Sequence, residues 1–293
     1  MSPRIGIVAS AHRPQNWMAL YKSIGDNDVE FELVFVGPNP PDYELPKNFR
    51  FIRSFVKPTQ CVEIAVRNTT ADLMMDIADD CEFNTPQPLD KLYAIYKLCN
   101  SDKIIVSSKI MTNGEDQSHF AHRFFAGDEN TPLMPICGLM SKKFYRDIGG
   151  IDKNFIAVMW SLDLTMRAYE AGGRVVMSDV YINEDRNKSA SSNLCNEFWE
   201  HDRGLLESLW TINGKVQSRR PIPVESFSDV EILKASQGPR GRWRGKGNIF
   251  IEKIENSMER YRLIFRRINR GIRKPSMYLK YVKRIALWLK GKP

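Results

Sequence analysis

The sequence predicts an α/β fold in which a mostly parallel central sheet is flanked by helices. Short apolar runs alternate with segments whose apolar residues recur every three or four positions. This alternation of strand-like and helix-like segments is the pattern of βαβ units, whose strands pair in parallel. Hydrophobic residues make up 42% of the 293 positions, which is enough for a sizeable core and excludes wholesale disorder.

The first elements follow each other closely along the chain. Ile5–Ala9 is a short apolar run that predicts a strand, and the turn-forming residues of Ser10–Pro14 follow it. Apolar residues at helical spacing then predict a helix that ends near Gly25. The same patterns predict further strands at Phe31–Val36, Phe49–Phe55 and Leu73–Ile77, and a helix at Gln60–Thr69.

The pattern continues with longer connections. The polar stretch Met111–Thr131 contains glycines and predicts a loop or an insertion. We expect helices at Leu89–Leu98, Lys142–Ile148 and Leu162–Ala171, and strands at Lys103–Ser107 and Arg174–Met177. Beyond about residue 215 the composition changes to Pro-, Gly- and Arg-rich linkers separated by helical patterns. We therefore expect one domain at residues 1–215, followed by a linker and a basic helical tail at residues 216–293.

The charge of the chain is concentrated at its C-terminal end. From Arg240 to Pro293 there are 17 Lys and Arg but only 3 Asp and Glu, a net charge of +14, whereas residues 1–239 carry −6. Two predicted helices in this tail combine an apolar stripe with dense basic residues, which suits the surface of an anionic membrane. The stripe could instead pack on the body or on a partner, and Trp243 among basic residues would also suit nucleic acid.

The start of the chain, its apolar runs and its cysteines bear on the cellular compartment of the protein. The chain starts without the apolar segment of a secretory leader, and no apolar run approaches the roughly 20 residues of a membrane span. Its five cysteines form no CxxC pair, which favours reduced thiols over disulfides or a zinc site. We therefore expect a cytoplasmic protein that associates peripherally with the cytoplasmic face of a membrane.

The most informative stretch is the apolar run Leu73–Ile77, which leads into Asp79 and Asp80. Ligands of open α/β sheets bind at the carboxyl ends of the strands. Mg²⁺ is commonly held there by one or two carboxylates together with phosphate oxygens of a substrate. The pair therefore points to nucleotide chemistry, although two adjacent Asp residues could also merely begin a turn or cap a helix.

With this pair and three further motifs, the chain resembles family 2-type glycosyltransferases of the GT-A fold over roughly residues 4–190. The motifs are the strand and turn at Ile5–Pro14, the DxD-type segment Ile77–Asp80, the segment Gly149–Asp152 and the helix Trp160–Gly172. The resemblance implies a metal-dependent, inverting transfer of a sugar from a nucleotide-sugar to a hydroxyl of a glycan or lipid-linked acceptor. It also implies synthesis of polysaccharide, lipopolysaccharide or glycolipid, and favours lipid over nucleic acid as the partner of the basic tail.

The resemblance assigns roles to individual residues. The residues that it implies for binding the nucleotide-sugar are Ser10, Ala11, Arg13, Glu63, Asp79 and Arg186. Binding of Mn²⁺ or Mg²⁺ falls to Asp80 and Asp185. Contact with the acceptor falls to Cys137, Gly138 and Trp160.

The chain departs from the family pattern in two places that bear on chemistry. Ala78 replaces the first acid of the DxD motif, and Trp160-Ser161 replaces the acid pair that usually supplies the general base. Asp163 is the candidate base because it is the only carboxylate between Asp152 and Glu170. Its alternative role is that of a structural acid near the start of a helix.

Two other functions are compatible with these residues. A nucleotidyl- or phosphotransferase would use the same acids and metal to move phosphorus instead of a sugar. A non-catalytic binding protein on a degenerate transferase scaffold would explain Ala78 and the missing acid pair.

Overall fold

The computed structural model describes residues 4–184, 193–212, 216–219 and 224–236. The chain divides into two compact units, Met1–Gly245 and Lys246–Pro293. The second unit, which contains most of the basic tail expected to bind membranes, lies outside the described residues.

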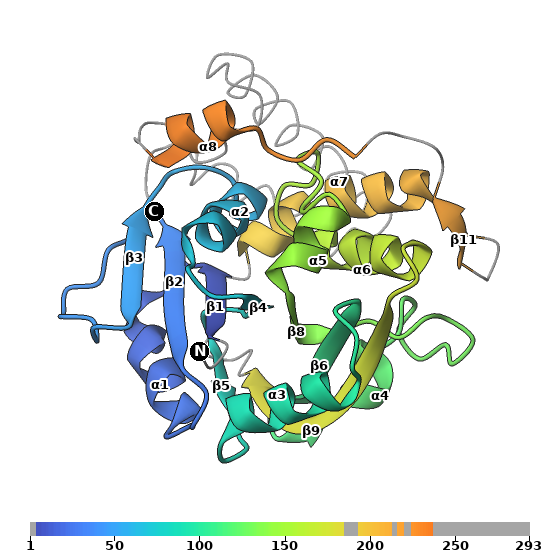
Figure 1. Cartoon of the computed structure of the whole chain (residues 1–293). Helices are drawn as coiled ribbons and strands as arrows, with labels where there is room; N and C mark the ends of the chain where they lie inside the picture. Colours follow the sequence, from blue (N-terminus) through green and yellow to red (C-terminus); the bar gives the residue numbers. More distant parts are fainter. Residues whose placement is uncertain (1–3, 185–192, 213–215, 220–223, 237–293) are drawn as a thin grey trace, which may run out of the picture. The chain divides into compact units, whose positions relative to one another are not determined.

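The main sheet has a parallel half and a mixed half (Figure 1). In the parallel half the strands lie in the order β3 (Phe49–Arg53), β2 (Phe31–Gly37), β1 (Ile5–Ser10) and β4 (Leu73–Asp76). The order continues with β8 (Ile136–Ser141), β6 (Ile104–Thr112), β9 (Arg174–Glu184) and β5 (Cys81–Phe83), and the short β7 (Glu115–Asp116) pairs with β6. In this second half β8 runs antiparallel to both of its neighbours.

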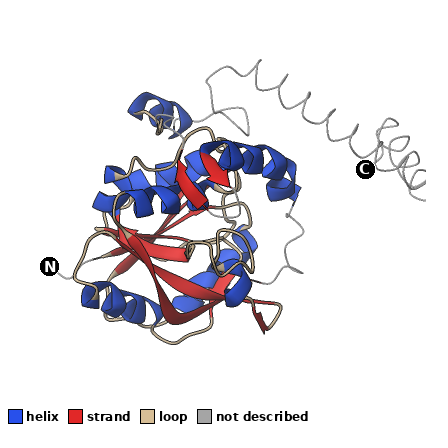
Figure 2. Cartoon of the chain, turned by 90° about the vertical axis from the view of Figure 1, so that its right-hand side faces the viewer, coloured by secondary structure: helices blue, strands red, loops and turns tan. Residues whose placement is uncertain are grey.

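Helices cover both faces of the sheet (Figure 2). One face packs against α1 (Pro14–Ile24) and α3 (Pro88–Leu98). The other packs against α2 (Pro58–Asn68), α5 (Lys142–Asp147) and α6 (Trp160–Glu170). The expected α/β fold of the GT-A type is thereby confirmed, with the difference that β8 and β5 make the second half of the sheet mixed.

The strands divide their side chains strictly between the two faces. On β4, for example, Met75 belongs to the core beneath α1 and α3, whereas Met74 belongs to the core beneath α2, α5 and α6. The same alternation separates Ile7 from Val8 on β1. Successive strand residues point to opposite faces of a sheet. Because helices cover both faces here, both sets of side chains are buried, and the strands are continuous apolar runs instead of alternating apolar and polar residues.

The chain after β9 adds elements to the same unit. These are α7 (Asn193–Leu209), the hairpin of β10 (Trp210–Ile212) and β11 (Val216–Arg219), and α8 (Asp229–Ser236); the one-turn helix α4 (Ser118–Ala121) lies in the earlier insertion. Phe227 and Ile232 join the core against α2, and Arg67 of α2 forms an ion pair with Asp229. Residues past the predicted boundary at 215 therefore pack on the body, at least as far as α8.

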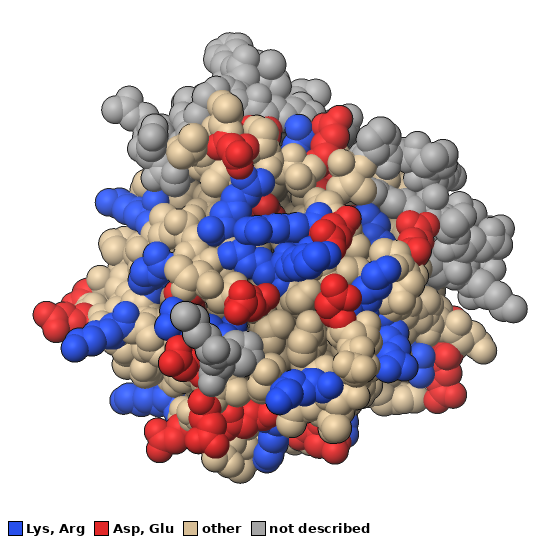
Figure 3. All heavy atoms as spheres, viewed as in Figure 1, with Lys and Arg blue, Asp and Glu red and all other residues tan. Residues whose placement is uncertain are grey.

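On the face drawn in Figure 3, acidic and basic side chains are interspersed, with one group of Lys and Arg near the middle. None of the helices in the described part of the chain is both long enough and apolar enough to span a membrane.

Candidate functional site

Asp79 ties the end of β4 to the loop that follows β1. Its Oδ2 accepts hydrogen bonds from the backbone N–H groups of His12 at 2.6 Å and Arg13 at 2.7 Å. It also accepts a bond from Nε1 of Trp17 at 3.3 Å, while Oδ1 accepts from Nε of Arg13 at 2.8 Å. Asp79 is 1% exposed, so its charge is balanced almost entirely by these donors. It fixes both the loop after β1 and the first turn of α1.

Arg13 joins the two adjacent carboxylates. Its guanidinium contacts Oδ1 of Asp79 at 2.5 Å and Oδ2 of Asp80. Burial lowers the pKa of Arg13, but the charges of Asp79 and Asp80 outweigh this and raise it overall. Burial raises the pKa of Asp80, the charge of Arg13 opposes that rise, and the charges of Asp79 and Glu184 add to it. The site is therefore a compact cluster of fixed charges with a permanent cation inside it.

The backbone around Ser10 and Ala11 is shaped by its neighbours. A Cβ atom at Gly37, the last residue of β2, would lie 1.7 Å from the carbonyl oxygen of Ala11. Only glycine therefore allows the loop after β1 to cross the end of β2 so closely. Nδ2 of Asn39 donates to the carbonyl of His12 at 3.0 Å and closes the loop from the other side. Ser10, Ala11 and Arg13 thus lie together with Asp79 and Asp80 at one edge of the sheet.

A second acid reaches this edge from β9. Glu184 is the last residue of β9 and pairs with Cys81, which directly follows Asp80. Within the described residues no group of three or more His, Cys, Asp or Glu gathers as a metal site. Asp80 and Glu184 nevertheless offer the hard oxygen donors that Mg²⁺ or Mn²⁺ takes together with phosphate oxygens. The donor set fits an ion that arrives with a diphosphate, while Asp185 and Arg186 lie outside the described residues.

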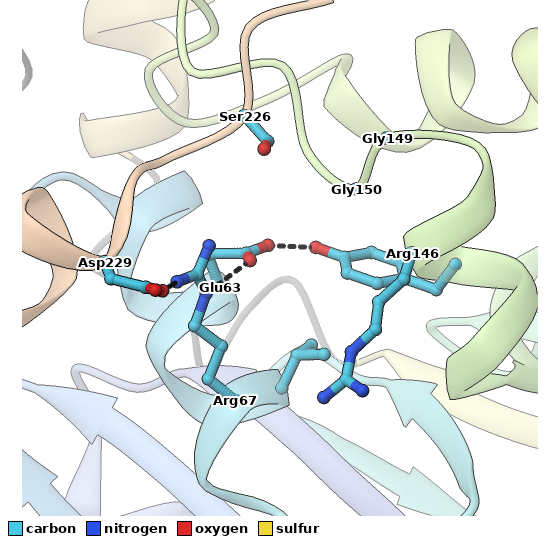
Figure 4. Close-up of a pocket in the computed structure, with 9 residues that line it drawn as sticks. Glu63, Arg67, Arg146, Gly149, Gly150, Ser226 and Asp229 are labelled. Carbon is cyan, nitrogen blue, oxygen red and sulfur yellow. Dashed lines mark hydrogen bonds and ion pairs between the residues drawn. The ribbon is translucent and has the colours of Figure 1, made fainter.

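Glu63 lies in a different place, in the middle of α2. It lines a cavity of about 460 Å³ whose walls come from α2, α5, the glycine turn after α5 and the segment before α8 (Figure 4). Its carboxylate accepts a hydrogen bond from the hydroxyl of Tyr145 and pairs with Arg67 at 2.8 Å. No residue of β1, β4 or their loops lines this cavity, so the structure does not bring Glu63 together with Asp79 and Asp80.

Asp163 is enclosed within α6. It is 0% exposed, and its carboxylate accepts bonds from Nε of Arg167 at 2.9 Å and Nε1 of Trp210 at 3.1 Å. Arg167 in turn donates to the carbonyls of Ile148 and Gly150. A general base must reach the proton that it removes. The geometry of Asp163 instead matches its alternative, structural role, because the carboxylate links α6 to the glycine turn.

The residues expected to contact an acceptor lie on two elements. Trp160 begins α6, is half-buried and packs against the cores on both sides of that helix. Cys137 on β8 has a φ of 47°, a left-handed conformation that is uncommon for a residue other than glycine. A Cβ at Gly138 would lie 2.6 Å from Cγ2 of Ile105, so β8 approaches β6 too closely there for a side chain.

Asp76 lies at the same edge of the sheet and carries no role in the family pattern. It is the last residue of β4 and stays half-buried, whereas the neighbouring Met75 and Ile77 are 0% and 5% exposed. Burial raises its pKa to about 6, against the opposing effect of hydrogen bonds from its own N–H and that of Gly138. A carboxylate inside an apolar strand was the available signal, since such groups are rarely buried without a reason.

Comparison with known proteins finds only weak structural similarity. No protein-family profile matches the sequence, and no curated protein matches it at a significant level. The crystal structure of S. aureus TarS 1–349 aligns with 14% identity and a TM-score of 0.46, over 62% of this chain and 60% of that chain. The complex of TarS 1–349 with UDP-GlcNAc aligns with 18% identity and a TM-score of 0.45, over 63% and 59%. The chain covers less than two thirds of these TarS chains, and a likeness of this degree assigns no function.

Proposed function

We propose that the chain is a glycosyltransferase that moves a sugar from a nucleotide-sugar donor to a hydroxyl of a glycan or lipid-linked acceptor, with inversion. The cluster of Asp79, Asp80 and Arg13 at the ends of β1 and β4 carries the proposal. Ligands of open α/β sheets bind at this edge. The loop that Asp79 fixes would hold the nucleotide through Ser10, Ala11 and Arg13, and Arg186 would add a basic group.

The charge of the cluster bears on how a diphosphate could bind. Two carboxylates and one guanidinium leave a net charge of −1, and Glu184 adds another negative charge nearby. A diphosphate would be repelled unless a cation came with it. Asp80 and Glu184, with Asp185 as the expected neighbour, would hold Mn²⁺ or Mg²⁺, and the ion would neutralise the charge that develops on the leaving diphosphate. In this proposal Asp79 organises the loop and does not bind the ribose.

The acceptor would lie on the β8 side of the site. Cys137, Gly138 and Trp160 are the residues that we propose to shape its pocket. Asp163 would position α6, which begins with Trp160, through its bonds to Arg167 and Trp210. The basic tail would keep the enzyme on the cytoplasmic face of a membrane, where lipid-linked acceptors for cell-surface polysaccharide, lipopolysaccharide or glycolipid are available.

Product analysis tests this function. The purified chain is incubated with UDP-, GDP- and TDP-linked hexoses and Mn²⁺, and the released products are identified by chromatography. We expect a nucleoside diphosphate, at a rate that falls when the metal is chelated. Release of pyrophosphate would instead indicate nucleotidyl transfer, and no turnover above background with any donor would support a non-catalytic binding protein.

A further inference from the structure

Asp76 occupies the same sheet edge as the proposed diphosphate site, at the point where β4 ends. In the parallel ladder it pairs with Val8 of β1, and its carboxylate accepts a hydrogen bond from the N–H of Gly138 on β8. It therefore lies between the strand that leads to the nucleotide loop and the strand that carries the proposed acceptor residues. Only three residues separate it from Asp80 along the chain.

Asp76 and the Asp79 cluster lie on opposite faces of the sheet. Asp79 accepts a bond from Trp17 of α1, which packs on the face that contains Met75. Because strand residues alternate, Asp76 points to the same face as Met74, which packs beneath α2, α5 and α6. Trp160, the first residue of α6, packs against that second core.

This arrangement matches the stereochemistry of an inverting transfer. In such a reaction the acceptor oxygen attacks the anomeric carbon from the side opposite the leaving group, so the base and the leaving group lie on opposite sides of the sugar. A sugar held at the edge of β4 would have its diphosphate toward the cluster of Arg13 and Asp80. Its other side would then face Asp76.

Among the described residues, no charged side chain contributes to the pKa shift of Asp76. Its pKa is shifted by burial and by two backbone N–H groups. The neighbouring titratable groups are the thiol of Cys137 and, hydrogen-bonded to it, the thiol of Cys81, whose contact raises the pKa of Cys137 well above its ordinary value. The raised pKa keeps the thiol of Cys137 neutral at physiological pH. Asp76 therefore differs from Asp163, which is paired with Arg167.

We propose that Asp76 is the general base of the transfer, which takes the role left open where Trp160-Ser161 replaces the usual acid pair. This rests on the proposed glycosyltransferase function. In the step, the acceptor oxygen forms a bond to the anomeric carbon while the bond from that carbon to the diphosphate oxygen breaks. The electron pair of the broken bond leaves with the nucleoside diphosphate, and the acceptor proton passes to an oxygen of Asp76.

The acidity of Asp76 suits this role. A base works best when its pKa lies close to the operating pH, and burial brings the pKa of Asp76 to about 6. At neutral pH the group is then largely ionised, yet basic enough to take a proton in the transition state. The residue as a whole is half-buried and ends β4, at the edge where we propose that the substrate binds.

The test compares the wild-type chain with Asp76→Asn and with the control Asp72→Asn, which changes an exposed acid just before β4. Turnover of UDP-, GDP- and TDP-linked hexoses is followed with Mn²⁺, with water as the acceptor, between pH 5 and 9. We expect Asp76→Asn to lose about 10²–10⁴-fold in kcat. Its remaining rate should lack the decline that the wild type shows below about pH 6, and Asp72→Asn should behave as the wild type.

Two further measurements separate the possible outcomes. Calorimetric donor binding should be retained in Asp76→Asn, and its melting temperature at neutral pH should be at least as high as that of the wild type, because the variant lacks a buried ionised carboxylate. Formate should restore part of the activity of Asp76→Ala by supplying a carboxylate. An active wild type whose Asp76→Asn variant keeps its turnover and its pH profile would overturn the role of Asp76 and leave the proposed function standing. A wild type that releases no nucleoside diphosphate from any donor would overturn both.

Discussion

At the scale of single residues, Asp79 and Arg13 organise the candidate site. Asp79 accepts bonds from two backbone N–H groups, from Trp17 and from the guanidinium of Arg13. Such a carboxylate cannot be removed without leaving donors unsatisfied and a buried cation without its partner. Asp80 shares the guanidinium but keeps more contact with solvent.

Replacing Asp79 should therefore cost stability as well as activity. We expect Asp79→Ala to lower the free energy of unfolding by about 3–5 kcal/mol, because breaking a buried ion pair leaves an uncompensated charge. Denaturant unfolding followed by circular dichroism measures the loss. Asp80→Asn is the matched comparison and should lose less stability; an equal loss in both variants would contradict the organising role of Asp79.

Asp76 should make stability depend on pH. Because burial raises its pKa from 3.8 to about 6, the folded state binds this proton more tightly than the unfolded chain does. Its contribution to the free energy of unfolding is therefore fully present below about pH 4 and is lost as the pH rises through 6. The loss is at most about 3 kcal/mol. In Asp76→Asn this decline should be absent from unfolding curves measured between pH 4 and 7, and an unchanged decline would show that another group causes it.

At the scale of elements, the order of strands and helices was predictable wherever strand-like and helix-like segments alternate along the chain. The strands Ile5–Ser10 and Phe31–Gly37 and the helix α2 lie within a few residues of their expected positions. The antiparallel β8 was not predictable, because a strand that returns through a loop can pair on either side without a crossover helix. Ile136–Ser141 also lacks a pattern that separates a strand from a loop.

In the candidate site, too, some features were predictable from the sequence and others were not. The position of Asp79 and Asp80 after an apolar strand was visible in the sequence, and the structure shows that Arg13 and the backbone of His12 bind Asp79. The enclosure of Asp163 was not visible, because its partner Trp210 lies 47 residues away. The separation of Glu63 from the site likewise depends on contacts with Tyr145, 82 positions further along the chain.

The loop before α6 depends on a single acid of α7. Asp202 is 0% exposed and accepts bonds from the N–H groups of Ile156 at 3.0 Å, Ala157 at 2.8 Å and Val158 at 2.8 Å. We expect Asp202→Ala to speed hydrogen exchange of these amides and to lower the free energy of unfolding by about 1–3 kcal/mol.

Glu207→Gln is the control on the same helix. Glu207 forms an exposed pair with Arg203, so its loss should change stability by less than about 1 kcal/mol. Unchanged exchange at Ile156–Val158 in Asp202→Ala would show that the loop holds its conformation without this carboxylate.

At the scale of the whole molecule, the two ends of the chain differ in charge. Residues 1–239 carry −6 and residues 240–293 carry +14, and the face of the body in Figure 3 mixes both signs. A surface of mixed charge attracts a polyanion weakly, whereas a dense basic segment attracts it strongly and in a salt-dependent way. Any attraction to an anionic membrane should therefore come from the tail.

Vesicle flotation checks this attribution. The full chain should float with vesicles that contain phosphatidylserine, should float less at high salt, and should not float with neutral phosphatidylcholine vesicles. A chain truncated after Pro239 should remain at the bottom of the gradient. Equal flotation of both chains would place the membrane contact on the body, and binding of the tail to single-stranded DNA but not to vesicles would favour nucleic acid.

In the proposed function, Asp80 binds a divalent cation that holds the diphosphate of a nucleotide-sugar, next to Arg13 and the loop that Asp79 organises. Calorimetric titration of the wild type and of Asp80→Asn with UDP-, GDP- and TDP-linked hexoses, with and without Mn²⁺, tests it most directly. We predict that at least one donor binds the wild type in the presence of Mn²⁺ and that its affinity falls at least about tenfold without the metal or in the variant. Equal affinity of that donor for both proteins, or no binding of any donor to the wild type, would contradict the claim.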